Sequence, residues 1–178
     1  MPDALYPMDY KTEMTVLIRK QEKMETRMKK MKTYAIGISL TGLLLYILQL
    51  LPNILWKFVP PANDVLARNA SASQILNFIE GFFGMMTVVL LVFLVRKGVE
   101  RNSNVYLVLA VLFLAGYYIS WILYYNGVVD PWLLIAGLAA MPPLYFFFSG
   151  LWLRNYVVLI PCAIFGVAHI IVTYSNYR

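Results

Sequence analysis

Two ionisable side chains lie well inside long apolar stretches of this sequence, and they are the first candidates for chemistry. They are Glu80 and His169. The other ionisable side chains inside these stretches are tyrosines and the single cysteine, Cys162. An ionisable group in the hydrocarbon layer costs about 3 kcal/mol on insertion scales, so it normally faces protein or a water-filled cavity. A carboxyl and an imidazole that meet there could exchange a proton. The alternative for both residues is a packing role with satisfied interhelical hydrogen bonds.

Polar and small residues recur at helical spacing around both side chains. Steps of three and four residues place a set on one face of a helix. One such set contains Ser73, Asn77, Glu80, Gly84 and Thr87, a second contains Ser39, Gly42, Tyr46, Gln49 and Asn53, and a third repeats every seven residues at Asn155, Cys162, His169 and Asn176. Such faces serve either a polar cavity or close packing, in which small residues and hydrogen bonds hold helices together.

The positions of these residues along their apolar segments predict where they meet. Glu80 lies six residues after Gln74 and His169 lies five before Tyr174, so both are expected at a similar depth near one membrane surface. We therefore expect a polar ligand-binding cavity that opens on that side. Its expected lining consists of Tyr46, Gln49, Asn77, Glu80, Tyr117, Ser120, His169 and Thr173.

The composition shows which elements must position these side chains. Apolar residues make up 61% of the 178 residues and charged residues 13%, whereas soluble proteins contain about 45–50% apolar residues even with glycine included. A bilayer-spanning helix needs about 20 mostly apolar residues. Five segments fit this requirement: 34–51, 74–95, 104–125, 132–152 and 155–174. We predict an all-α integral membrane protein with a five-helix transmembrane domain over 34–178 and a polar arm over 1–33.

The distribution of lysine and arginine predicts how the spans are oriented. Twelve of the 15 cations lie before the first span, between the second and third spans, or at Arg154; the other three are Lys57, Arg68 and Arg178. Cations in short flanking segments stay on the cytoplasmic side. We expect a multi-pass protein of the cell (inner) membrane, with its N-terminus in the cytoplasm and its C-terminus outside. Five crossings require a tight turn at Arg154-Asn155, the only polar break between the last two spans. If Arg154 were buried instead, the chain would have four spans.

The arm before the first span has the pattern of an amphipathic helix. Its apolar residues occupy the a and d positions of a heptad repeat. They are Met14, Leu17, Met24, Met28 and Met31. We expect this helix to lie on lipid headgroups in the cytoplasm; the alternatives are a short coiled coil that makes a homodimer, and docking to a calmodulin-like or other partner. The net charge of +6 fits attraction to an anionic leaflet, so nucleic acid is not expected as a partner.

Two further features concern the surroundings of the expected cavity. Pro142 and Pro143 lie at the middle of the fourth span, where two prolines remove backbone donors and predict a kink. The segment 52–73 is the only long connection between spans, and it could cap the cavity.

Two membrane families share features with this chain. Five spans, a similar length and a long first loop with Trp56 and Pro60-Pro61 resemble the translocator-protein family, whose loop is richer in Trp and Pro. Glu80 with the aliphatic run to Arg96, and Pro143-Leu144-Tyr145-Phe146 with Asn155, are similar to stretches of the emopamil-binding, sterol-isomerase-like family over about half the chain. This chain lacks that family's acidic and histidine positions in the first span and has a fifth span, so no catalytic roles are transferred. Both resemblances imply a lipophilic ligand.

No motif for a reaction or a cofactor accompanies these residues. The sequence has no Walker loop, dinucleotide fingerprint, HExxH or paired thiols, and one His with one Cys is too few for a transition-metal site. No cofactor, metal or catalytic residue is therefore expected. The expected function is binding or transport of a small amphipathic or cationic molecule. The alternatives are a non-catalytic membrane subunit or scaffold, and a membrane enzyme that uses Glu80 and His169 as acid and base on a lipophilic substrate.

Overall fold

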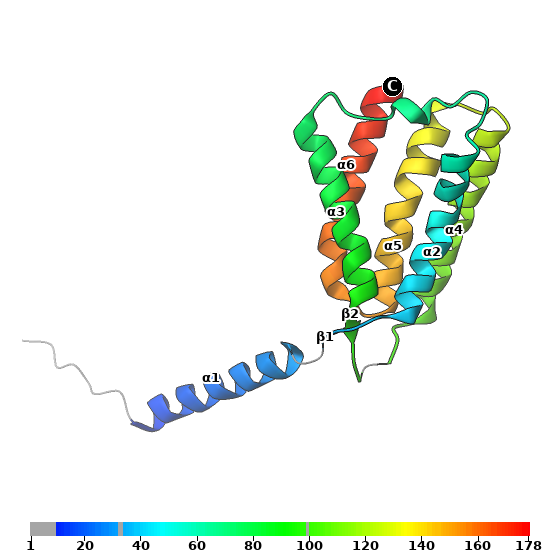
Figure 1. The fold of residues 1–178 in the computed structure, drawn as a ribbon. Coiled ribbons are helices and arrows are strands. Elements are labelled where there is room, and N and C mark those ends of the chain that lie inside the picture. The colour runs from blue at the N-terminus through cyan, green and yellow to red at the C-terminus, as the bar shows by residue number, and fades with distance from the viewer. Residues whose placement is uncertain (1–9, 32–33, 99) are drawn as a thin grey trace, which may run out of the picture.

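A bundle of five long helices forms the body of the protein (Figure 1). The computed structural model describes residues 10–31, 34–98 and 100–178. Its elements in chain order are α1 (Tyr10–Met31), β1 (Tyr34–Ile36), α2 (Leu40–Phe58), η1 (Leu66–Arg68), α3 (Gln74–Phe93), β2 (Leu94–Arg96), α4 (Asn104–Tyr125), η2 (Leu133–Ala140), α5 (Met141–Trp152), η3 (Tyr156–Val158) and α6 (Leu159–Tyr177). Within this part of the chain, five helical segments are long and apolar enough to cross a membrane, which confirms the predicted fold class.

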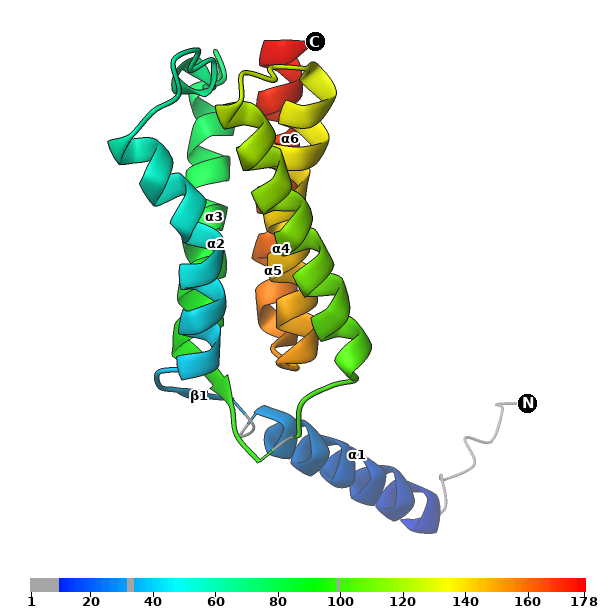
Figure 2. The same ribbon diagram turned by 90° about the vertical axis from the view of Figure 1, so that its right-hand side faces the viewer.

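The helices pack so that segments far apart in sequence become neighbours. α3 lies along α6, α4 lies along α5, and α2 contacts both α3 and α4 (Figures 1 and 2). The connection 59–73 and the C-terminus lie at one end of the bundle, which we call the loop end. β1, β2 and the turn between α5 and α6 lie at the opposite end, which we call the strand end.

The N-terminal helix α1 lies outside the bundle in both views (Figures 1 and 2). Its described side chains from Thr12 to Thr26 are all exposed, including the apolar Met14, Leu17 and Met24. Met28 and Met31 lie outside the residues whose side chains are described. The helix is thus present as predicted and is not a membrane span.

The first spanning helix begins and ends later than the apolar run 34–51 predicts. Residues Tyr34–Ile36 pair instead with Leu94–Arg96 as a short antiparallel ribbon, which also ends α3 at Phe93. Ser39 then starts α2, because its Oγ accepts a hydrogen bond from the Gly42 amide at 3.0 Å. A side-chain oxygen at this position satisfies one of the helix's free amide groups.

Helix α2 continues through Pro52 to Phe58, although that proline suggests the start of a loop. Proline has no amide proton, so the carbonyl of Leu48, four residues earlier, loses its helical donor. The hydroxyl of Tyr118 in α4 donates to this carbonyl at 2.6 Å. A contact between helices therefore compensates for the bond that the sequence removes.

The tight turn expected at Arg154 separates α5 from the last span. Arg154 adopts a left-handed backbone conformation with φ of 54°. The neighbouring Asn155 is 2% exposed, and its Nδ2 donates to the carbonyls of Leu90 at 2.8 Å and Leu94 at 3.0 Å. These carbonyls lie at the end of α3, where backbone carbonyls have no amide partner within the helix. The turn thus fastens α3 and α5 together at the strand end.

Candidate ligand-binding cavity

Glu80 and His169 lie in contact between α3 and α6. The distance from Glu80 Oε1 to His169 Nδ1 is 2.5 Å. Both side chains keep access to the surroundings, with 22% of Glu80 and 25% of His169 exposed. A carboxylate and an imidazole at this distance share one proton or form an ion pair, depending on the protonation of the ring.

Contacts of α6 with α5 and α3 position the side chain of His169. Cys162 Sγ contacts the carbonyl of Pro143 at 3.1 Å, which sets the side of α6 that faces α5. Phe165 stacks on the His169 ring with centroids 5.2 Å apart. Gly84 of α3 leaves the room for this phenyl ring, because a Cβ there would lie 3.2 Å from it. Packing therefore restrains the imidazole.

The Glu80–His169 pair lies on the wall of a cavity toward the loop end, with a volume of about 290 Å³. Five of the eight predicted residues line it. They are Gln49, Glu80, Tyr117, His169 and Thr173. Four helices that the sequence separates widely contribute these side chains, so the bundle brings most of the predicted set together.

The other three predicted residues lie outside this lining. Tyr46 packs with the apolar core around Leu45. Asn77 binds the backbone of Ser71 through both atoms of its amide, at 2.8 Å each, and so orders the connection before α3. Ser120 donates to the carbonyl of Gly116 in its own helix at 2.8 Å, a common local alternative for serine in helices.

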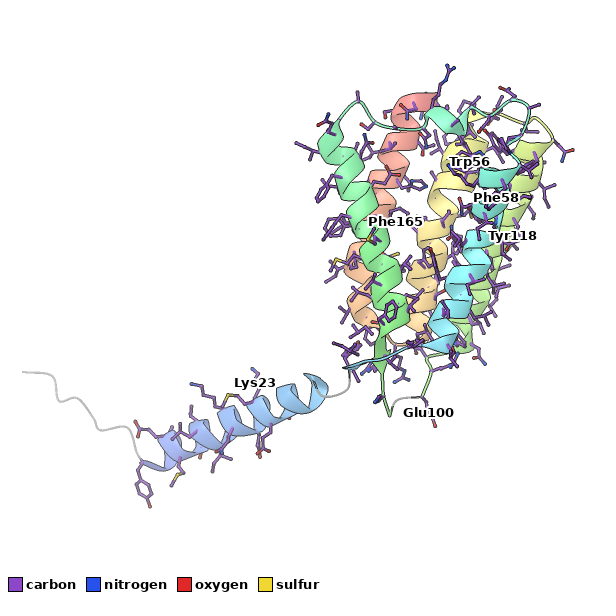
Figure 3. All side chains as sticks on the ribbon, in the orientation of Figure 1. Lys23, Trp56, Phe58, Glu100, Tyr118 and Phe165 are labelled. Carbon is purple, nitrogen blue, oxygen red and sulfur yellow. The ribbon has the colours of Figure 1, made fainter. Side chains whose placement is uncertain are left out.

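Several lining residues were not in the predicted set. Asn53 lies on the same polar face as Gln49, and its Nδ2 donates to the Tyr117 hydroxyl at 2.8 Å. Trp56 and Trp121 line the cavity with ring centroids 6.1 Å apart. Trp56, labelled in Figure 3, lies toward the loop end. Its position resembles that of an interfacial anchor in the sequence, and only the fold shows that the ring borders a cavity.

The fourth span changes helical type beside the cavity. Leu133–Ala140 forms a π-helix that passes into α5 at Met141, just before Pro142 and Pro143. The carbonyl of Leu138 would need a donor four or five residues later, and both of those residues are prolines. Leu138 and Pro142 line the cavity. The structure thus has a π-helix just before the two prolines, a type of helix that is frequent at functional sites, and the kink at the prolines themselves stays a prediction.

The connection 59–73 covers part of the cavity at the loop end. Leu66 and Asn69 belong to its lining. Asp64 holds the connection in place, because its Oδ1 accepts from Trp56 Nε1 at 3.0 Å and from the Tyr124 hydroxyl at 2.8 Å. The described contacts therefore place this segment as a cap.

Asn69 joins the same cap to α6. Its Nδ2 donates to Thr173 Oγ1 at 3.0 Å, and its Oδ1 accepts from Asn176 Nδ2 at 2.8 Å. Thr173 in turn donates to the carbonyl of His169 at 3.0 Å. A chain of hydrogen bonds thus connects the cap with the helix turn that carries the imidazole.

The part of the chain that the structure describes contains no group of three or more His, Cys, Asp and Glu side chains that could hold a metal ion. No family model, curated protein or solved structure matches the chain.

Proposed function

We propose that this multi-pass membrane protein binds a small amphipathic organic cation in the cavity, with transport across the membrane as the expected consequence. The observation that carries the proposal is the contact of 2.5 Å between Glu80 and His169 on the cavity wall. A carboxylate at this place can hold either a protonated imidazole or the positive charge of a ligand. Glu80 would be the charge partner of the ligand, and His169 would take up or release the proton.

The charges of the lining favour a cation over an anion. Among the described residues that line the cavity, Glu80 is the only carboxylate, and none is a Lys or Arg. Partly desolvated cations also gain up to about 2 kcal/mol from the face of an aromatic ring. Trp56, Trp121 and Tyr117 provide such rings around the same space.

The polarity of the walls supports an amphipathic ligand. Leu134, Leu138 and Phe165 offer apolar surface on one part of the lining, while Gln49 and Asn53 offer amide groups on another. A volume of about 290 Å³ is close to the lower end of the usual range for ligand sites, roughly 300–1,000 Å³. The ligand is therefore expected to be smaller than a typical drug molecule.

The proposal includes the orientation of the protein in the membrane and the contacts of α1. The excess of Lys and Arg at the strand end supports a cytoplasmic N-terminus in the cell membrane and a cavity that opens to the outside. The exposed apolar residues of α1 support contact with lipid headgroups, and a homodimer through this helix is the second candidate.

Titration with phenyltrimethylammonium tests the proposal directly. Two of the four tryptophans, Trp56 and Trp121, line the cavity, so ligand binding should change the intrinsic fluorescence of the protein in lipid nanodiscs. We expect saturable binding by the wild type and a loss of at least about tenfold in Glu80→Gln, equivalent to about 1.4 kcal/mol.

Glu100→Gln is the matched control, because it makes the same chemical change at an exposed position at the strand end (Figure 3). This variant should bind like the wild type. Equal binding by wild type and Glu80→Gln, with equal thermal stability, would contradict the proposal. Absence of saturable binding in the wild type would favour a scaffold role instead.

A further inference from the structure

A second polar pocket lies at the strand end, away from the cavity described above. Its volume is about 220 Å³. Its polar lining residues come from the start of α2 and from the connections that follow α3 and α5. They are Ser39, Thr41, Arg96, Arg101 and Asn155.

Neither arginine of this pocket has a carboxylate partner among the described residues. The ion pair found there within 4.0 Å joins Glu80 and His169, toward the loop end. Arg96 donates one hydrogen bond to the carbonyl of Arg154 at 3.2 Å, and its Nε is buried without a partner. Arg101 Nη2 donates to Thr41 Oγ1 at 2.7 Å. Both of these acceptors are neutral, so two positive charges line one pocket without local neutralisation.

Aromatic rings hold both guanidinium groups in place. Arg96 Cζ lies 5.6 Å from the ring centroid of Tyr34 and 5.3 Å from that of Tyr156. Arg101 Cζ lies 4.2 Å from the ring centroid of Trp152. A guanidinium has about five donors, of which such stacking uses none. The ring contacts therefore restrain both guanidinium groups and leave N–H donors that an anion could use.

The rest of the pocket fits a phosphate that carries a hydroxyl-bearing group. Helix α2 begins beside it after Ser39, and a helix N-terminus favours a negative charge. Asn155 is 2% exposed, with its Nδ2 fixed by two carbonyls of α3, and its Oδ1 is buried without a partner. An amide oxygen accepts hydrogen bonds and does not donate them, so a hydroxyl of the ligand would suit Asn155 Oδ1.

We propose that this pocket binds the phosphate of an anionic phospholipid headgroup between Arg96 and Arg101, with a headgroup hydroxyl donating to Asn155. A lipid is favoured over a free phosphate because Leu91, Leu94 and Leu153 line the same pocket at the end of the apolar spans. Basic pockets between membrane helices commonly bind anionic lipid headgroups. This site is independent of the proposed cation site.

The test measures lipid retention by native mass spectrometry after reconstitution in mixed phosphatidylglycerol and phosphatidylcholine. We expect the wild type to retain one phosphatidylglycerol in preference to phosphatidylcholine. Arg101→Gln should lower this retention at least tenfold, and Arg101→Lys should also lower it, because lysine keeps the charge but loses the planar fork. If Arg101→Gln does not fold, Arg101→Lys alone decides the outcome.

Arg19→Gln is the matched control, because it removes one exposed cation from α1 without touching the pocket. Retention unchanged by Arg101→Gln, or lowered equally by Arg19→Gln, would overturn the proposal in favour of diffuse attraction. A parallel arm adds inorganic phosphate to protein in phosphatidylcholine nanodiscs and measures thermal unfolding. Stabilisation by phosphatidylglycerol alone supports the lipid headgroup; equal stabilisation by inorganic phosphate would overturn the assignment to a lipid.

Discussion

His169 Nδ1 lies 2.5 Å from Glu80 Oε1 across the interface between α3 and α6, on the wall of a cavity. The two residues are 89 positions apart in sequence. This contact allows one carboxylate to serve either the proton on an imidazole or the charge of a bound cation.

Cation binding should compete with protonation of the Glu80–His169 pair. Among the described residues that line the cavity, the other titratable group is Tyr117, which carries no charge near neutral pH. A bound cation beside Glu80 disfavours imidazolium, so a proton should leave His169. We expect phenyltrimethylammonium to bind more tightly at about pH 8 than at about pH 6, because fewer protons then compete with the cation for this site.

Proton release in weakly buffered solution and binding isotherms at both pH values measure this coupling. His169→Gln is expected to bind the cation with little dependence on pH. A pH dependence of the same size in His169→Gln as in the wild type would show that another group is responsible.

Asp64→Ala should loosen the cap over the cavity. The substitution leaves the donors of Trp56 and Tyr124 without their shared acceptor, which typically costs about 1–3 kcal/mol. Amide hydrogen exchange over residues 64–70 should accelerate roughly tenfold or more, since exchange follows the free energy of local opening. Asn63→Ala changes an exposed neighbour and should leave the exchange rates unchanged. Slow exchange in both variants would show that Asp64 does not hold the cap.

Two glycine substitutions should differ in their effect on stability. A Cβ on Gly42 would collide with the backbone carbonyl of Leu91, where α2 meets α3. Gly42→Ala is expected to lower the free energy of unfolding by about 1–3 kcal/mol. A Cβ on Gly81 would meet no neighbouring segment within 4 Å, so Gly81→Ala should cause no loss. Thermal unfolding in one detergent compares them, and equal transition temperatures would contradict the close contact.

Cysteine labelling should reveal the orientation of the bundle. The native Cys162 is 0% exposed and should not react, so introduced cysteines can be read against a low background. Ala62→Cys at the loop end should react with a membrane-impermeant maleimide on intact cells. Glu100→Cys at the strand end should react only after the membrane is opened. The reverse pattern would place the N-terminus outside.

Local sequence patterns are sufficient to predict which faces of the spans carry polar groups. Steps of three, four and seven residues place Glu80 and His169 on definite faces of their helices, because helical periodicity is fixed by the backbone alone. Their similar distance from the ends of two apolar segments places them at one depth. The Arg154 turn is predictable for the same reason, as a polar break inside apolar sequence.

The lining of the cavity is predictable only in part. Asn77 and Ser120 have the expected helical spacing, but each uses its polar group on nearby backbone. Short polar side chains have such local alternatives, which periodicity does not reveal. The position of Trp56 in the sequence is typical of a membrane anchor, whereas the folded chain holds its indole against Asp64 at the border of the cavity.

The sequence alone determined the number of spans, the amphipathic arm and the faces that carry polar groups, because these follow from apolar length and helical period. The tertiary structure decided which faces meet, how Tyr118 compensates for Pro52, and that Asp64 fastens the cap. The physical reason is that all five spans present similar apolar surfaces to one another. Their neighbours are then selected by the fit of small residues and by hydrogen bonds between distant segments.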